Sequence, residues 1–154
     1  MELLVEWSKP ITLKDGSKHY LTYELSDKDL NKISFDGGIY VFGRRYGSTI
    51  KALYVGQATN LQKRIKQQLN NAKLMNYLKG ATKGNRVLLY GKAITKPGQT
   101  MKKFIAIVER TLIRHFLSEG CDLANKQGTR VRKHEIVCKG KQPKKFIPSR
   151  MYSK

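Results

Sequence analysis

Two apolar segments joined by a short polar connection constrain the fold of this chain more than any other feature. Residues 38–42 and 50–55 are rich in β-branched and aromatic side chains, and residues 43–48 between them are rich in Arg and Gly. This pattern predicts two strands of an antiparallel hairpin with a turn over 43–48. Gly56 ends the second strand, so a different element must follow it.

A helix is expected directly after this hairpin. Thr59 and Gln62 have the spacing of a capping box. The apolar side chains recur every four residues, at Leu61, Ile65 and Leu69. Because this stripe must be buried, we expect the helix to pack against the hairpin.

A third strand and a longer helix are predicted next. Residues 86–94 are apolar, and Pro97-Gly98 breaks the chain before a helix over 100–117. Glu109 lies at the edge of the apolar stripe of that helix, where an isolated carboxylate is costly to bury. We therefore expect a metal ion or an arginine beside Glu109. The simpler alternative is a structural ion pair with the neighbours of Arg110 or with Arg64.

The first 36 residues predict an attachment to this core. Apolar and polar residues alternate on both sides of 14–17, where an Asp-Gly pair predicts a hairpin turn. Ser26 is a suitable N-cap for a short helix that ends near Ile33, with Asp29 at its third position. We expect a hairpin and one helical turn before the core begins.

The last residues predict a basic extension. Residues 129–138 favour a strand, and residues 139–154, with two prolines and many lysines, favour an extended arm that contacts phosphates. The expected division is an N-terminal extension at 1–36, a core at 37–127 and a C-terminal extension at 128–154, within one structural domain. The predicted fold class is α/β, more narrowly α+β, with a small and mainly antiparallel sheet of about three strands flanked by helices.

The distribution of charge predicts a polyanionic partner. The chain has 31 Lys and Arg against 11 Asp and Glu, a net charge of +20. No carboxylate lies between Asp36 and Glu109, whereas fourteen Lys or Arg do. One sign of charge over so long a stretch indicates a face of a binding cleft for nucleic acid. A membrane fits less well, because we find no long apolar run and no signal peptide, so an intracellular location is expected.

The two cysteines favour reduced thiols. Cys121 and Cys138 occur without a secretory signal. Together with His115 and His134 they could be written as a zinc site, but the spacing is irregular and no CxxC pair exists. Structural cysteines are the expected case.

Five sequence elements, in order, resemble the GIY-YIG nuclease family. They are Gly38-Ile39-Tyr40, Tyr54-Val55-Gly56, Arg64 in the capped helix, Glu109 in the second helix and Asn125 after it. The resemblance covers about residues 37–127 and implies a GIY-YIG-type fold. Two departures stand out: the spacer at 41–53 is longer than usual, and Gln57 occupies a position that is Lys in many members.

The resemblance implies hydrolysis of DNA phosphodiester bonds with Mg²⁺ or Mn²⁺. Glu109 would bind the metal, Arg64 would hold the scissile phosphate, and Asn125 would give a hydrogen bond near the metal. Tyr40 would accept or relay the proton of the attacking water while Tyr54 orients water or phosphate, although the sequence does not decide which tyrosine does which. Nearby cations and a metal are expected to favour the phenolate form.

The expected partner is DNA, double-stranded or branched rather than RNA, in a prokaryotic or phage-infected cell. The alternatives are a non-catalytic nucleic-acid-binding protein on the same scaffold and a dimeric, sequence-specific restriction endonuclease. Whether the chain is a monomer or a homodimer stays open, as do the cleavage preference and the biological role. The DNA contacts are expected from five cations, Arg44, Arg45, Lys63, Arg130 and Arg132.

Overall fold

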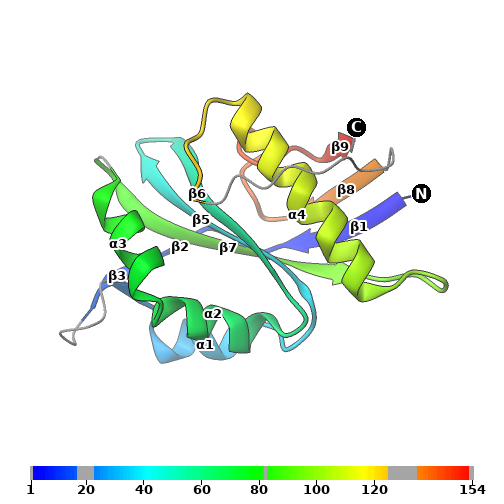
Figure 1. Ribbon diagram of the computed structural model, residues 1–154, viewed down its shortest axis with the longest axis horizontal. Helices are drawn as coiled ribbons and strands as arrows, with labels where there is room; N and C mark the ends of the chain where they lie inside the picture. The colour runs from blue at the N-terminus through cyan, green and yellow to red at the C-terminus, as the bar shows by residue number, and fades with distance from the viewer. Residues whose placement is uncertain (1, 17–22, 82, 125–134, 153–154) are drawn as a thin grey trace.

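The main sheet is larger than the sequence predicts. A computed structural model describes residues 2–16, 23–81, 83–124 and 135–152. Within these residues seven strands form one sheet, with the order β6-β5-β7-β1-β8-β9 and with β2 paired to β7 (Figure 1). Every pairing is antiparallel except that of β1 with β8. The strands are β1 (Glu2–Trp7), β2 (Ile11–Thr12), β5 (Gly38–Tyr46), β6 (Thr49–Ala58), β7 (Asn85–Ile94), β8 (Glu135–Gly140) and β9 (Arg150–Tyr152).

Helices cover both faces of this sheet, so the fold is α+β. Helices α1 (Asp27–Lys32), α2 (Leu61–Leu69) and α3 (Ala72–Gly80) lie on one face, and α4 (Met101–Ser118) lies on the other (Figure 1). Each face therefore has its own apolar core. Tyr40 and Phe42 of β5 point into the core under α2 and α3, whereas Ile39 and Val41 point into the core under α4. This is the alternation that a strand buried on both faces requires.

Several sequence predictions are confirmed. The hairpin of β5 and β6, the strand β7 and the long helix α4 occur where the apolar patterns predict them. Helix α1 has Ser26 as its N-cap, whose side chain accepts a hydrogen bond from the Asp29 amide at 3.2 Å. The central hairpin, β7 and α4 are thus specified by local patterns, whereas the sequence analysis did not predict α3 (Ala72–Gly80).

The estimate of about three strands is wrong, because both ends of the chain enter the sheet. Strand β1 pairs with β7 on one side and with β8 on the other. Its alternating residues Leu3, Val5 and Trp7 are buried. Residues 139–152, the described part of the predicted arm at 139–154, do not form a free arm: Phe146 and Ile147 are buried in the core under α4, and β9 pairs with β8. The division into 1–36, 37–127 and 128–154 stays a prediction.

Three local predictions also need correction. The turn expected over 43–48 is shorter, because β5 continues to Tyr46 and Gly47 takes the positive φ of the turn. Lys14 and Asp15, expected in a turn, form strand β3 (Lys14–Asp15), which pairs with β4 (Tyr23–Glu24). The connection at 17–22 lies outside the described residues. The N-cap of α2 is Asn60 rather than Thr59, and its side chain accepts from the Lys63 amide at 3.0 Å.

No helix in the described ranges has both the length and the apolar character needed to cross a membrane.

Candidate active site

The β5–β6 hairpin places the two predicted tyrosines on the face that α2 covers. Tyr40 of β5 is almost fully buried and Tyr54 of β6 is half-buried. Their rings stack with centroids 6.1 Å apart and planes inclined by 24°. Gly56 is the strand partner of Tyr40, and a Cβ added at Gly56 would overlap the Tyr40 ring and hydroxyl. The glycine of Tyr54-Val55-Gly56 therefore leaves the space that the Tyr40 ring occupies.

Gln68 of α2 links the two tyrosines. Its side-chain Nε2 donates to the Tyr40 hydroxyl oxygen at 2.7 Å and to the Tyr54 hydroxyl oxygen at 3.2 Å. Its Oε1 accepts from Asn71 at 3.0 Å, which fixes the orientation of the amide. Because each phenol oxygen accepts from Gln68, the proton of each hydroxyl is free to point to another acceptor. Each hydroxyl can therefore donate to a further acceptor, and the half-buried Tyr54 is the more accessible of the two.

Sequence reasoning missed Gln68, although a signal was present. Gln68 lies seven residues after Leu61 and three after Ile65, so it falls on the apolar stripe of α2. It is only 3% exposed. A polar residue on a buried stripe needs hydrogen-bond partners, and here the two tyrosines supply them.

Arg64 of α2 lies close enough to Tyr40 for its guanidinium to lower the pKa of that phenol. It is exposed, donates weakly to Gln67 at 3.4 Å, and lines a cavity of about 350 Å³ with Asn60 and Lys63. Gln57, at the position that departs from the family pattern, lines the same cavity. The structure therefore brings Tyr54 and Arg64 beside Tyr40, and both Arg64 and Lys63 are exposed to solvent.

Helix α2 offers side chains rather than backbone amides to a phosphate. The Leu61 amide donates to the Asp36 carbonyl and the Gln62 amide to the Ser34 carbonyl, both at 3.0 Å. The Lys63 amide is used by the Asn60 cap. Since these first-turn donors already have partners, Arg64 and Lys63 must supply any phosphate contact from this helix.

The environment of Tyr40 does not favour the phenolate that the sequence led us to expect. Burial raises the pKa of Tyr40 to about 12, and the neighbouring Tyr54 adds to this rise. The hydrogen bond from Gln68 and the nearby Arg64 guanidinium pull the pKa of Tyr40 in the opposite direction but do not prevail. Tyr40 is therefore a neutral phenol at neutral pH in the protein alone.

Glu109 lies on α4, the helix on the opposite face of the sheet from α2. Burial raises the pKa of its half-buried carboxyl, and the adjacent Arg110 lowers that pKa by less. No hydrogen bond or salt bridge connects Glu109 to Tyr40, Tyr54 or Arg64. The ion pair with Arg64 considered from the sequence is thus absent between these two described residues. The metal-binding role of Glu109 stays a prediction.

Several predicted site residues lie outside the described residues, namely Asn125, Arg130 and Arg132. Just before them, the Ala124 amide donates to the Leu53 carbonyl at 2.8 Å, so the segment that leads to Asn125 runs beside β6. Leu53 is the extra residue of a β-bulge, directly before Tyr54. The described segment that ends at Ala124 therefore lies beside the residue that precedes Tyr54. The contacts of Asn125 stay a prediction.

The remaining predicted DNA contacts are on the surface. Arg44 and Arg45 are half-exposed near the tip of the β5–β6 hairpin, and Lys63 is exposed on α2. Arg44 donates to the Lys83 carbonyl at 3.1 Å, so its side chain has a fixed anchor.

Among the residues with described positions, no group of three or more His, Cys, Asp or Glu side chains could hold a metal ion. His134, one of the four residues considered for zinc, lies outside the described residues. Cys121 and Cys138 are both buried and unpaired as disulfides, as expected for structural cysteines.

Comparison of this chain with protein-family models, with curated proteins and with solved structures gives no match.

Proposed function

We propose that this protein is a metal-dependent endonuclease that hydrolyses DNA phosphodiester bonds. The observation that carries the proposal is the cluster of two tyrosine hydroxyls bound to the Gln68 amide, with the Arg64 guanidinium near Tyr40. The order of the five sequence elements that resemble the GIY-YIG family supports the same activity. The net charge of +20 supports a nucleic-acid substrate.

Arg64 would hold the scissile phosphate. A guanidinium presents several donors in a plane that matches two phosphate oxygens. Because Arg64 is exposed beside Tyr40, a phosphate bound to it would lie next to the Tyr40 hydroxyl. Lys63, which lines the same cavity, adds a second cation for the phosphate of a neighbouring nucleotide.

Tyr40 would relay a proton rather than act as a phenolate base. With its pKa near 12, Tyr40 is protonated at neutral pH. Its oxygen can accept the proton of the attacking water while its own proton passes to an oxygen of the phosphate, so that no charge accumulates on the phenol. The bond from Gln68 holds the oxygen in place for this exchange. Tyr54 would orient the water or the phosphate.

Glu109 fits a metal ligand in its chemistry. Its carboxyl is partly desolvated, and no salt bridge within the described residues neutralises it, so a cation would relieve the cost of its burial. Mg²⁺ needs only one or two carboxylates, because it keeps several waters and binds substrate oxygens. Bound there, Mg²⁺ or Mn²⁺ would supply charge neutralisation and water activation, although α4 and the tyrosine cluster lie on opposite faces of the sheet.

A second candidate function is non-catalytic binding of nucleic acid. It is favoured by the raised pKa of Tyr40 and by the lack of a bond between Glu109 and the tyrosine cluster. A binder would leave the length of DNA unchanged at every metal concentration. A dimeric restriction enzyme, the other alternative, would cut plasmid into discrete bands.

The experiment is a plasmid-nicking assay with Mg²⁺ or Mn²⁺ on the full chain. The matched variants are Glu109→Gln and Glu119→Gln, since Glu119 is an exposed carboxylate at the C-cap of the same helix. We expect metal-dependent nicking by the wild type, a loss of roughly 100-fold or more in Glu109→Gln, and no comparable loss in Glu119→Gln. DNA binding and thermal unfolding should be retained in both variants. Intact plasmid in all reactions would favour the binder.

A further inference from the structure

Two adjoining cavities lie between the β5–β6 hairpin, α3 and residues 120–124 after α4. Their volumes are about 560 Å³ and about 760 Å³. Asn76, Tyr77 and Asp122 line both, and Tyr54 lines the second. Because the two cavities share these three residues, they form a continuous surface from Tyr54 of the candidate active site to the basic residues of the hairpin. We call the two cavities together the hairpin groove.

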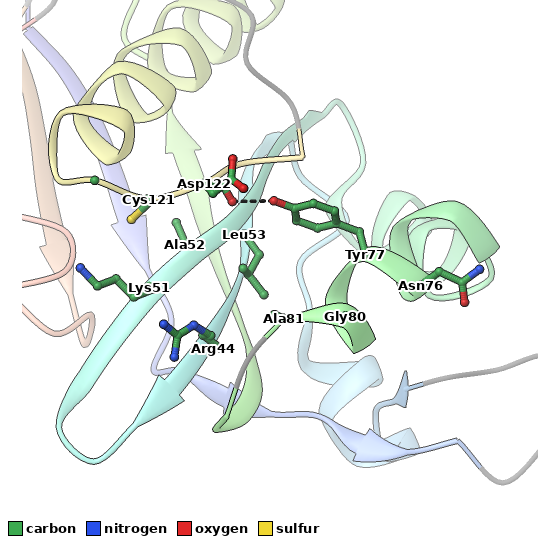
Figure 2. A pocket seen from close by; sticks show the side chains of 11 residues that line it. Arg44, Lys51, Ala52, Leu53, Asn76, Tyr77, Gly80, Ala81, Cys121 and Asp122 are labelled. Carbon is green, nitrogen blue, oxygen red and sulfur yellow. Dashed lines mark hydrogen bonds between the residues drawn. The ribbon is translucent and has the colours of Figure 1, made fainter.

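Positive charge predominates along the groove. Arg44 and Lys51 are partners across the hairpin, and both line the first cavity (Figure 2). Lys73 lines the second cavity. Asp122 is the single carboxylate among the described residues that line either one. The lining thus has three cations against one anion, which suits a ligand that carries phosphate.

Helix α3 supplies an aromatic wall opposite the hairpin. The Tyr77 hydroxyl donates to the Asp122 carbonyl at 2.6 Å, the dashed line in Figure 2. This bond ties the ring to the segment after α4, between the two cavities. A fixed tyrosine ring is a surface on which a nucleobase of any sequence can stack. Phosphate-binding cations and a stacking ring on facing walls match the two parts of a single nucleotide.

We propose that the hairpin groove binds an unpaired strand of the DNA, next to the phosphate that Arg64 holds. Pockets of roughly 300–1,000 Å³ hold single small molecules, so each cavity has room for a nucleotide but not for stacked base pairs. In a duplex the bases face their partners and are not free to stack on Tyr77. The groove therefore selects forked, flapped or gapped DNA over continuous duplex. This inference rests on the proposed function for the place of the cut, but strand binding itself does not require cleavage.

Gly80 allows the groove to be blocked without a change of charge. It lines the first cavity at the end of α3, and its φ is not positive. Apart from its chain neighbours and the backbone of its own helix, no atom lies within 4 Å of a Cβ added there. A Gly80→Trp side chain would therefore begin without a clash at the edge of the first cavity. Ala72→Trp is the matched control, because Ala72 is exposed on the same helix and lines neither cavity.

The test is fluorescence anisotropy without divalent metal, which excludes cleavage. The probes are a forked duplex with an unpaired arm of about ten nucleotides and a blunt duplex with the same number of phosphates. We expect the wild type and Ala72→Trp to prefer the fork by roughly tenfold. Gly80→Trp should bind both probes equally, with its affinity for the blunt duplex and its thermal unfolding unchanged. Lys51→Gln should reduce the preference, whereas Lys103→Gln, on α4 and outside the groove, should not.

Equal affinity of the wild type for fork and blunt duplex would overturn the inference, as would a preference that survives in Gly80→Trp. These outcomes are separate from failure of the nuclease proposal. Cleavage without a preference for the fork would support the nuclease proposal and contradict the proposed role of the hairpin groove. A preference for the fork without cleavage would support the role of the groove in a protein that only binds DNA.

Discussion

Gly56 faces Tyr40 across the β5–β6 hairpin, and a Cβ at this position would overlap the Tyr40 ring. Gly56→Ala should therefore displace Tyr40 from Gln68 and destabilise the protein by about 1–3 kcal/mol, the usual cost of overpacking. The measurement is the midpoint of urea unfolding. Gly80→Ala is the control, because its Cβ meets open space; within a helix it should be neutral or stabilising by up to about 1 kcal/mol. Equal midpoints for both variants would contradict the packing described for Tyr40.

The raised pKa of Tyr40 predicts a specific loss of stability at high pH. The unfolded chain ionises this phenol near pH 10, whereas the folded protein keeps the proton to about pH 12. The stability that neutral Tyr40 contributes is complete below pH 10 and is lost as the pH rises to about 12. Its size is on the order of 2 kcal/mol.

Urea unfolding of the wild type and of Tyr40→Phe at pH values below and above this window measures that contribution. The variant should lose less stability across the window, whereas Tyr46→Phe, which alters an exposed ring at the hairpin tip, should follow the wild type. Parallel curves for wild type and Tyr40→Phe would show that Tyr40 ionises as freely in the folded protein as in the unfolded chain.

At the level of single residues the sequence predicts part of the candidate site. Tyr40, Tyr54 and Arg64 come from strand and helix positions that local patterns fix, and the structure brings them together. Gln68 was missed because its importance depends on which face of α2 meets the hairpin, which is a tertiary fact. The raised pKa of Tyr40 could not be foreseen either, because it depends on burial under α2 rather than on the count of nearby cations.

Among the secondary-structure elements, those with a clear local sequence pattern were predicted, and those that depend on pairing with distant segments were not. Strands β5, β6 and β7 and helix α4 have long apolar patterns and were predicted. Strand β1 is short, and the alternation of Leu3, Val5 and Trp7 did not by itself predict a strand. The strand is defined by its pairing with β7 and β8, which are distant in sequence. The C-terminal segment is dominated by lysines and two prolines, which obscured the two buried apolar residues Phe146 and Ile147.

The burial of the C-terminal segment predicts that it stabilises the fold. Ile147 is fully buried in the core under α4, so Ile147→Ala should lower the free energy of unfolding by about 2–5 kcal/mol. Lys145→Ala, an exposed position two residues away, should change it by no more than about 0.5 kcal/mol. Chemical denaturation measures both. If Ile147→Ala were as stable as the wild type, residues 139–154 would behave as the free arm that the sequence suggested.

The whole molecule combines a net charge of +20 with a two-faced core that does not depend on disulfides. Binding to duplex DNA should therefore weaken steeply with salt, because each neutralised phosphate adds about 0.9 to the slope of log K against log salt. We expect a slope that corresponds to several phosphates. Lys63→Gln should reduce it by about one phosphate contact, or roughly 0.9, whereas the opposite charge change Glu119→Gln should not reduce it. A slope near zero for the wild type would contradict the electrostatic account of binding.

The central claim is that the tyrosine cluster performs phosphodiester hydrolysis, and one comparison tests it most directly. Tyr40 and Tyr90 are partners on adjacent strands and lie on the same face of the sheet, but Tyr90 has no bond to Gln68. The measurement is the rate of metal-dependent DNA cleavage at saturating protein for wild type, Tyr40→Phe and Tyr90→Phe. We predict that Tyr40→Phe cleaves roughly 100-fold or more slowly, with unchanged DNA affinity, and that Tyr90→Phe cleaves at nearly the wild-type rate. Equal rates for wild type and Tyr40→Phe, or no cleavage by the wild type with any divalent metal, would contradict the claim.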